Sequence, residues 1–242
     1  YYLYTDLDQN GFAVLPLFIY MNIQDYLVKK QTIQKNLIEF IDKSTNIEEN
    51  YQNLIIQFKD QKLLEHKNSI KELLLLILEI SSNHFRTPRF FNKIERIISE
   101  MKEEIQENFS SNEIFKLFQS NKRIILYFIE EKIIKIDTSI VNIMNNDENK
   151  KFCYFEYFYL EVKPFLNNRI KIEIESKNNE LKENNLDSFK EKRKLGENDD
   201  YISHMIRNDL IDEFISFVNQ KNYFLSSTIK PSIYETNLYL IK

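Results

Sequence analysis

The sequence is poor in the residues that make tight turns. It has two glycines and four prolines in 242 residues. Sandwiches and barrels need many turn residues, and α/β nucleotide sites need glycine-rich loops, so the scarcity argues against both. None of the motifs G-x-x-x-x-G-K-[ST], G-x-G-x-x-G or G-x-S-x-G occurs. This argues strongly against P-loop, Rossmann and α/β-hydrolase chemistry and favours helices joined by polar turns.

Cysteine is almost absent. The single Cys153 excludes an internal disulfide framework and a multi-cysteine zinc site, and it fits a reducing, intracellular and cytoplasmic setting. Cys153 lies among aromatic residues in "KFCYFEYF". Apolar surroundings raise the pKa of a thiol, so we expect an inert side chain, with a nucleophile as the less favoured alternative.

The sequence also lacks long runs of basic residues and long runs of apolar residues. Its 33 basic and 37 acidic residues give a net charge of -4 with no long basic run, which argues against a nucleic-acid partner. The apolar runs Leu73–Ile80 and Phe12–Met21 are too short to span a membrane, and no basic region precedes the second as in a signal peptide. We therefore expect no membrane span.

Apolar residues recur at three- and four-residue spacing along most of the chain, which predicts an all-α fold of stacked helical hairpins. Thr87 and Pro88 are typical of a helix start. No strand with clean alternation stands out. The best candidates are Ile133–Asp137 and Arg169–Glu175, and a short hairpin or a helix extension is the alternative for the second. The predicted helical segments are 22–44, 46–64, 69–81, 87–109, 112–119, 123–133, 138–144 and 154–166.

The apolar pattern weakens after residue 174. Residues 175–200 carry eight acidic and six basic residues, a balance that predicts a solvated helix or a linker. The predicted domains are thus a separate N-terminal segment (1–21), a helical domain (22–174), a charged linker or exposed helix (175–198), and a hairpin (199–242).

Two regions share a pattern of short helix, polar turn and second helix. They begin at Ile114 and Ile202, and Ile125 and Leu126 in the first correspond to Phe214 and Ile215 in the second. Chance similarity in a chain rich in Ile and Phe is an equal alternative. A true repeat would predict hairpins that bury their apolar sides only by stacking, as in an α-solenoid.

Two groups of residues raise the question of a metal site. Asp6, Asp8, Asn10 and Gly11 match the start of an EF-hand loop, but Leu17 stands where the closing glutamate belongs and Pro16 precedes it, so we favour a polar turn. An acidic cluster surrounds His204. We interpret it as helix caps and a solvated edge, and a metal-dependent enzyme is the alternative. Its members are Asp199, Asp200, His204, Asp209, Asp212 and Glu213.

The other histidines are His66 and His84. No histidine belongs to an H-E-x-x-H motif, so the usual helical zinc spacing is absent. His66 is flanked by charges and is expected to be exposed, and His84 falls in a predicted turn between helices. We expect structural roles for all three histidines.

An aromatic cluster extends from Phe152 to Phe165, on both sides of Cys153. We favour core packing for these rings, and an exposed surface for a partner protein is the alternative. The cluster comprises Phe152, Tyr154, Phe155, Tyr157, Phe158, Tyr159 and Phe165.

Three stretches resemble a known family. "HFRTPRFFNKIE", "EIFKLFQSNKRIILYFIEEKIIKID" and "KRKLGENDDYISHMIRNDLIDEFISFVNQ" with its continuation to Lys242 are similar to the helical region that precedes the repeats in a large ankyrin-repeat family of protists. The resemblance covers residues 22–242. It implies that residues 199–242 form a degenerate ankyrin-like unit, since Tyr201–His204 replaces T-P-L-H, and that regular repeats of the same chain follow.

The sequence favours a non-catalytic role, with no catalytic, cofactor-binding or metal-binding residue assigned and no cofactor. We expect a protein–protein interaction scaffold, or a region that caps an ankyrin array. The alternatives are a metal-dependent enzyme using the cluster around His204 and a purely structural helical module. The protein partners are not identified by the sequence.

Overall fold

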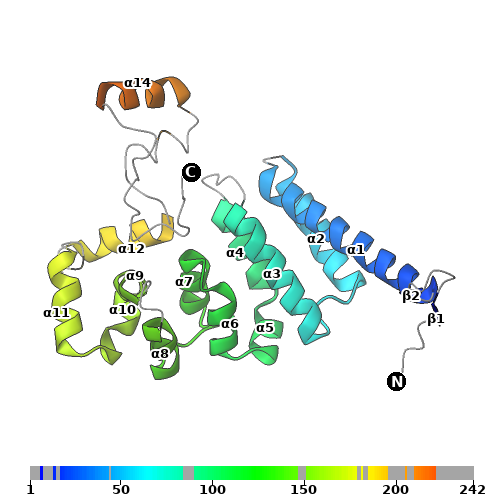
Figure 1. Ribbon diagram of the computed structural model, residues 1–242, viewed down its shortest axis with the longest axis horizontal. Coiled ribbons are helices and arrows are strands. Elements are labelled where there is room, and N and C mark those ends of the chain that lie inside the picture. The colour runs from blue at the N-terminus through cyan, green and yellow to red at the C-terminus, as the bar shows by residue number, and fades with distance from the viewer. Residues whose placement is uncertain are drawn as a thin grey trace. The chain divides into compact units, whose positions relative to one another are not determined.

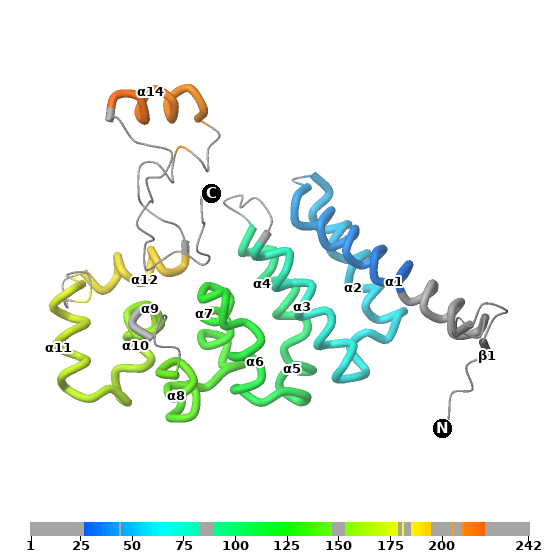
Figure 2. Tube along the Cα trace, in the orientation of Figure 1, coloured from blue at the N-terminus to red at the C-terminus, as the bar shows by residue number. Residues whose placement is uncertain are grey.

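The computed structural model describes residues 6–7, 13–14, 17–43, 45–83, 90–146, 151–178, 181, 185–195, 205 and 210–221 (Figures 1 and 2). The chain divides into two compact units, residues 1–66 and 67–242. The predicted helical domain of residues 22–174 therefore spans parts of both units. Apart from one pair of two-residue strands, every regular element in the described residues is helical, which confirms the all-α prediction.

The first unit contains two strands and two helices. Strands β1 (Asp6–Leu7) and β2 (Ala13–Val14) are antiparallel, with Asp6 opposite Val14 and Leu7 opposite Ala13. Helix α1 (Leu17–Asp42) begins directly after Pro16, earlier than the predicted start at residue 22, and α2 is Ile47–Asp60. The strands were not expected. They pair the first two positions of the EF-hand-like loop with its eighth and ninth, and the polar turn predicted between these positions lies outside the described residues.

Helices α1 and α2 form an antiparallel hairpin with an apolar seam. The rings of Phe40 and Tyr51 lie 5.5 Å apart, and Asn36 Nδ2 donates to Gln57 Oε1 at 2.8 Å, so later residues of α2 contact earlier residues of α1. The turn uses Asn46 with a φ of 53°, a left-handed conformation that asparagine tolerates better than most residues. The seam consists of Ile33, Leu37, Phe40, Ile41, Tyr51, Leu54, Ile55 and Phe58, all buried.

The second unit is built from short helices. They are α3 (Lys67–Asn83), α4 (Phe90–Glu100), α5 (Lys102–Asn108), α6 (Ser111–Phe118), α7 (Lys122–Glu130), α8 (Thr138–Asn146), α9 (Lys151–Tyr157), α10 (Tyr159–Val162), the 3-10 helix η1 (Lys163–Phe165), α11 (Asn168–Lys177), α12 (Leu186–Leu195) and α14 (Ile211–Lys221). Residues Arg169–Glu175 lie inside α11, so a strand at these positions is wrong and they are helical. Residues Ile133–Asp137 form no regular element.

Polar residues in the turns cap the helices that follow them. Ser110 caps α6 in a capping box: its hydroxyl accepts from the Glu113 N–H, while its own N–H donates to the Glu113 carboxylate at 2.8 Å. Asn121 accepts from the Ile124 N–H at the start of α7 and donates to Ser81 Oγ at 3.0 Å inside the core. The polar turn predicted between the helical segments 112–119 and 123–133 is therefore present.

Apolar stripes create the core of the second unit. The stripe predicted for residues 87–109 is buried at Phe90, Ile94, Ile97, Ile98, Met101 and Ile105, although the helix breaks at Met101 into α4 and α5. Thr87 and Pro88, expected at its start, lie outside the described residues. Helix α3 has one buried and one exposed side. The buried side consists of Ile70, Leu73, Leu74, Leu76, Ile77 and Ile80, and the exposed side of Lys71, Glu72, Leu75 and Glu79.

Contacts in the second unit link helices that are close in sequence. Helix α3 contacts α4 and α5, α6 contacts α7 and α8, and α8 contacts α9. Helix α9 also contacts α11, and α12 returns to contact α7. Helix α12 therefore lies beside the middle of this unit, where its charged residues form the network described next.

Candidate functional site

Helix α12 is anchored by a buried arginine. Arg193 donates to both carboxylate oxygens of Glu161 in α10, at 2.7 and 3.0 Å, and to the Tyr157 carbonyl at 2.9 Å. Its guanidinium also lies 5.0 Å from the centre of the Phe189 ring. The Tyr157 hydroxyl donates back to the Arg193 carbonyl at 2.9 Å. A forked arginine–carboxylate pair of this kind fixes geometry as well as charge.

A second buried arginine joins α12 to α7 and α4. Arg123 Nε donates to the Lys194 carbonyl, and the guanidinium pairs with Glu95 and lies 5.4 Å from the centre of the Phe91 ring. Burial raises the pKa of Glu95, and the Arg123 charge opposes that rise. Both arginines are nearly inaccessible to solvent, so the two pairs hold α12 in place.

Tyr157 lies between these cations. Its ring is fully buried, with Lys122 Nζ 5.0 Å and the Arg193 guanidinium 5.9 Å from its centre. Burial raises the pKa of Tyr157 far above its ordinary value. The phenol therefore stays neutral and acts as a hydrogen-bond donor to α12.

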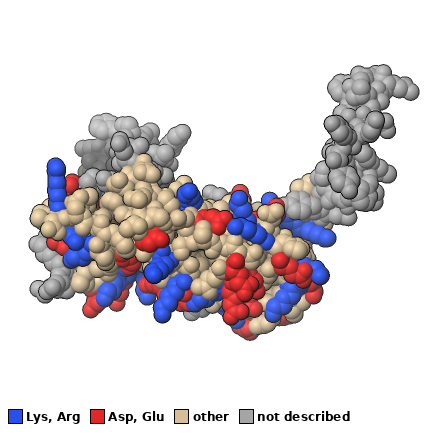
Figure 3. Space-filling view, turned by 90° about the horizontal axis from the view of Figure 1, so that it is seen from below, with Lys and Arg blue, Asp and Glu red and all other residues tan. Residues whose placement is uncertain are grey.

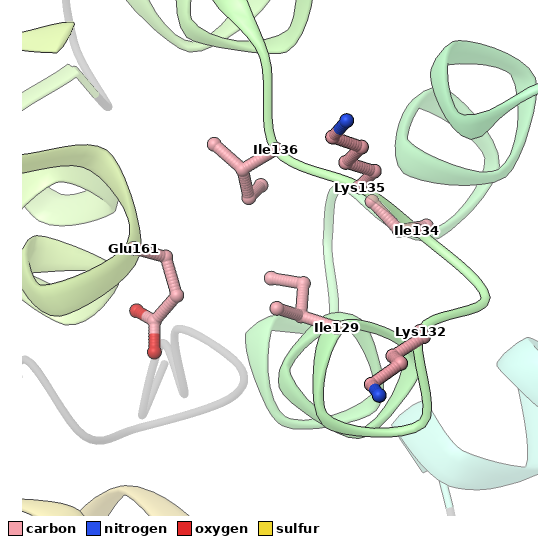
Figure 4. A pocket seen from close by; sticks show the side chains of 6 residues that line it. All are labelled: Ile129, Lys132, Ile134, Lys135, Ile136 and Glu161. Atoms are coloured by element: carbon pink, nitrogen blue, oxygen red, sulfur yellow. The ribbon is translucent and has the colours of Figure 1, made fainter. Parts of the chain in front are cut away.

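A pocket of about 400 Å³ lies next to this network. Figure 4 shows Glu161 of α10 on one side, Lys132 and Lys135 on the other, and the side chains of Ile129 and Ile136 between them. Ile134 completes the lining. The pocket is thus mainly apolar, with charged residues at its edge, and it lies between the C-terminal end of α7, the segment after it and α10.

The charges around the pocket do not cancel. Glu161 is paired with Arg193, Glu131 with Lys102 at 3.0 Å, and Glu130 with Lys194 at 3.3 Å. Lys132 and Lys135, in contrast, form no salt bridge with any residue in the described part of the chain. Asp137, two residues after Lys135, accepts hydrogen bonds from Ser139 and the Ile140 N–H. The edge of the pocket therefore carries two lysines that form no salt bridge within the described residues, although the Lys135 charge interacts with the Asp137 carboxylate.

The predicted acidic cluster is described only in part. Asp212 and Glu213 lie in the first turn of α14 and are exposed, as expected for a solvated edge. Asp199, Asp200, His204 and Asp209 lie outside the described residues. Within the ranges that are described, no group of three or more His, Cys, Asp or Glu side chains is placed to hold a metal ion.

The remaining histidines and the N-terminal loop add little to the site. His66 is exposed in the turn before α3, as predicted, and His84 lies outside the described residues, as do Asp8, Asn10 and Gly11. No helix in the described residues is long and apolar enough to cross a membrane.

Cys153 differs from the prediction. It lies on the outer side of α9 and is exposed, so the expected burial among aromatic rings is wrong. The helical spacing explains this, because Tyr154, Phe155, Tyr157 and Phe158 occupy the inner side of α9 and its end. Lys122 Nζ lies 3.2 Å from the thiol sulfur.

The aromatic cluster is mostly core, as favoured by the sequence. Tyr154, Phe155, Tyr157, Phe158 and Tyr159 are buried, with the Tyr157 and Phe158 rings edge to face at 4.9 Å. Phe165 is the exception, since it is 40% exposed. The side chain of Phe152 lies outside the described residues.

Helix α14 is not packed as its sequence suggests. Ile211 is 59% and Ile215 51% exposed, and Phe214, Phe217 and Val218 are only partly buried. The pattern of apolar residues predicts which side of a helix is apolar but not whether a neighbour covers it. Ile211 and Ile215 therefore form an uncovered apolar stripe on α14.

The surface carries charges of both signs. On the face drawn in Figure 3, basic and acidic side chains are interspersed rather than gathered into one continuous basic area. Such a face lacks the large positive footprint that nucleic-acid backbones require.

Comparisons of this chain with models of protein families, with curated proteins and with solved structures give no match.

Proposed function

We propose that this chain is a non-catalytic protein-interaction scaffold made of stacked helical hairpins. The observation that carries the proposal is the uncovered stripe of α14, where Ile211 and Ile215 are more than half exposed one helical turn apart. A contiguous exposed apolar area at the surface of a protein is typical of an interaction site, whereas single exposed apolar residues are common.

The contacts of the second unit support a solenoid-like arrangement. Helix α6 packs on its hairpin partner α7 and also on α8, the first helix of the next hairpin, and α3 contacts both α4 and α5. Contacts between near neighbours in sequence are what stacked repeats produce. A stack of this kind presents helix faces and turns along its length, which is the surface that scaffold proteins use to bind partners.

The proposal includes a role next to an ankyrin array. The resemblance of residues 22–242 to the region preceding such arrays implies an intracellular protein in which this chain covers one end of the array. Terminal units of solenoids cover the apolar end of the stack. The test is the natural sequence after Lys242: repeats of about 33 residues with a T-P-L-H-x-A pattern support this role, and their absence contradicts it.

The interaction role is tested by capture experiments with matched variants. A tagged wild-type chain, the double variant Ile211→Glu/Ile215→Glu and the control Asn219→Glu are incubated with an extract of the source cells, and captured proteins are quantified. Asn219 is an exposed polar position of the same helix. We expect the wild type and the control to recover the same specific proteins and the double variant to lose them. Equal recovery by all three contradicts the role of α14.

A further inference from the structure

The pocket beside α10 has the character of a site for an aliphatic anchor. Three isoleucine side chains line it, and its volume of about 400 Å³ falls in the range of about 300–1,000 Å³ that binding pockets occupy. Its lining contains no residue of α14. An apolar side chain from another segment or molecule would meet this isoleucine lining.

The edge of the pocket selects for negative charge. The three glutamates near it, Glu130, Glu131 and Glu161, are each held by a cation, whereas Lys132 and Lys135 form no salt bridge in the described residues, and Lys135 interacts only at longer range with Asp137. A ligand that places carboxylates beside an aliphatic group satisfies both parts of the pocket. Complementary charge at an interface directs the choice and orientation of the partner.

Helix α14 has this combination of groups. Ile211 and Ile215 lie one turn apart on the same side of the helix, so they form one apolar ridge. Asp212 and Glu213 follow Ile211 directly and are exposed, which places two carboxylates beside that ridge. An amphipathic helix that inserts its apolar side into a groove is a common mode of recognition between proteins.

We propose that α14 of one copy of this chain docks into the pocket of a second copy. Ile211 and Ile215 enter the pocket lined by Ile129, Ile134 and Ile136, and Asp212 and Glu213 face Lys132 and Lys135. The proposal rests on the function proposed above and names the partner as the chain itself. Because the two surfaces differ, the contact is head-to-tail, and a pair of copies keeps one free α14 at one end and one free pocket at the other.

The test is the molar mass of the full chain in sedimentation experiments over a range of concentrations. We expect the mass of the wild type to rise with concentration. Two charge-reversal variants, Lys132→Glu/Lys135→Glu and Asp212→Lys/Glu213→Lys, each place like charges on both surfaces and weaken association by about tenfold or more, which corresponds to about 1.4 kcal/mol or more.

Mixing the two charge-reversal variants gives the decisive result. In the mixture, each pocket meets an α14 of opposite charge, so we expect association to return. The control Lys62→Glu/Lys190→Glu changes the net charge by the same amount as Lys132→Glu/Lys135→Glu, but at exposed lysines outside the pocket. It should associate like the wild type. Circular dichroism confirms that each variant is folded.

Three outcomes overturn the proposal: a wild type that stays monomeric at every concentration, association that survives Lys132→Glu/Lys135→Glu, or a mixture that does not associate. A monomeric wild type in which α14 occupies the pocket of its own chain belongs to the first. If the chain is monomeric but Ile211→Glu/Ile215→Glu still abolishes capture of other proteins, the scaffold function stands and only self-association is rejected.

Discussion

Helices α12 and α14 have nearly the same length. The more charged helix, α12, is anchored by buried side chains, whereas the more apolar helix, α14, has exposed apolar side chains. Six of the ten residues of α12 are charged, yet the helix is anchored through Phe189 and Arg193, which are both buried. Helix α14 has three charged residues in eleven and five large apolar ones, yet Ile211 and Ile215 are exposed. Burial in this unit therefore depends on specific partners rather than on average hydrophobicity.

The two helices differ in burial because they contact different residues. Arg193 enters the core only because Glu161, the Tyr157 carbonyl and the Phe189 ring compensate its charge there. A buried arginine without such partners would cost several kcal/mol, about the stability of a small domain. For α14 the apolar residues are present, but Ile211 and Ile215 are more than half exposed.

The largest expected effect is on the anchor of α12. Arg193→Ala leaves Glu161 without its partner at a mostly buried position, so we expect it to lower the free energy of unfolding of the second unit by about 3–5 kcal/mol. Arg193→Lys should restore only part of the loss, because an ammonium cannot form the forked pair. Urea unfolding followed by circular dichroism measures this. The control Lys190→Ala removes an exposed pair with Asp187 and should cost about 0.5 kcal/mol or less.

A matched pair of phenylalanines tests the comparison directly. Phe189→Ala in α12 removes a fully buried ring and should cost about 3 kcal/mol, whereas Phe214→Ala in α14 removes a partly buried one and should cost about 1 kcal/mol or less. Thermal unfolding of the two variants gives the difference. Equal losses would mean that α14 is packed as firmly as α12, and the contrast would fail.

A smaller effect is expected at the start of α6. Ser110→Ala removes the hydroxyl of the capping box and should cost about 1 kcal/mol. Ser216→Ala, an exposed position within α14, should change the stability by no more than about 0.5 kcal/mol. If the two substitutions have the same effect in urea titrations, the cap does not stabilise the unit.

The smallest effect depends on pH. A hydrogen bond from Lys67, followed by those from Ser110, lowers the pKa of Glu113 from 4.5 to about 2. Because the pKa is lower in the folded state, the stabilisation is present above pH 4.5 and is lost as the pH falls toward 2. Glu113→Gln should therefore lower the stability at neutral pH slightly and flatten its decline in that window. Exposed Glu107→Gln serves as the control, and a decline as steep in Glu113→Gln as in the wild type contradicts the assignment.

The sequence predicts helices well where one apolar stripe meets clear polar turns. The stripe of α4 and the turn at Asn121 were both expected from spacing and residue type alone. The strands β1 and β2 were missed because each is only two residues long, too short for an alternating pattern to show. The break at Met101 was missed because the apolar stripe continues across it.

The candidate site was less predictable, because long-range pairing decides it. Arg193 lies in a segment whose balanced charges indicate solvent exposure, and nothing near it in sequence shows that Glu161 and Tyr157 will surround it. The pocket likewise joins residues of α7, the segment after it and α10. Three isoleucines at positions 129, 134 and 136, interrupted by two lysines, were the only local signal of an apolar pocket with a basic edge.

The reciprocal bonds between Tyr157 and Arg193 have a consequence for how the protein opens. Each side chain bonds the other's main-chain carbonyl, so α12 cannot leave without breaking contacts at the end of α9 as well. The amide protons of these two helices should therefore exchange with solvent in one cooperative event, although about 30 residues separate the helices in sequence. Helix α14, which lacks such a tie among the described residues, should exchange independently and sooner.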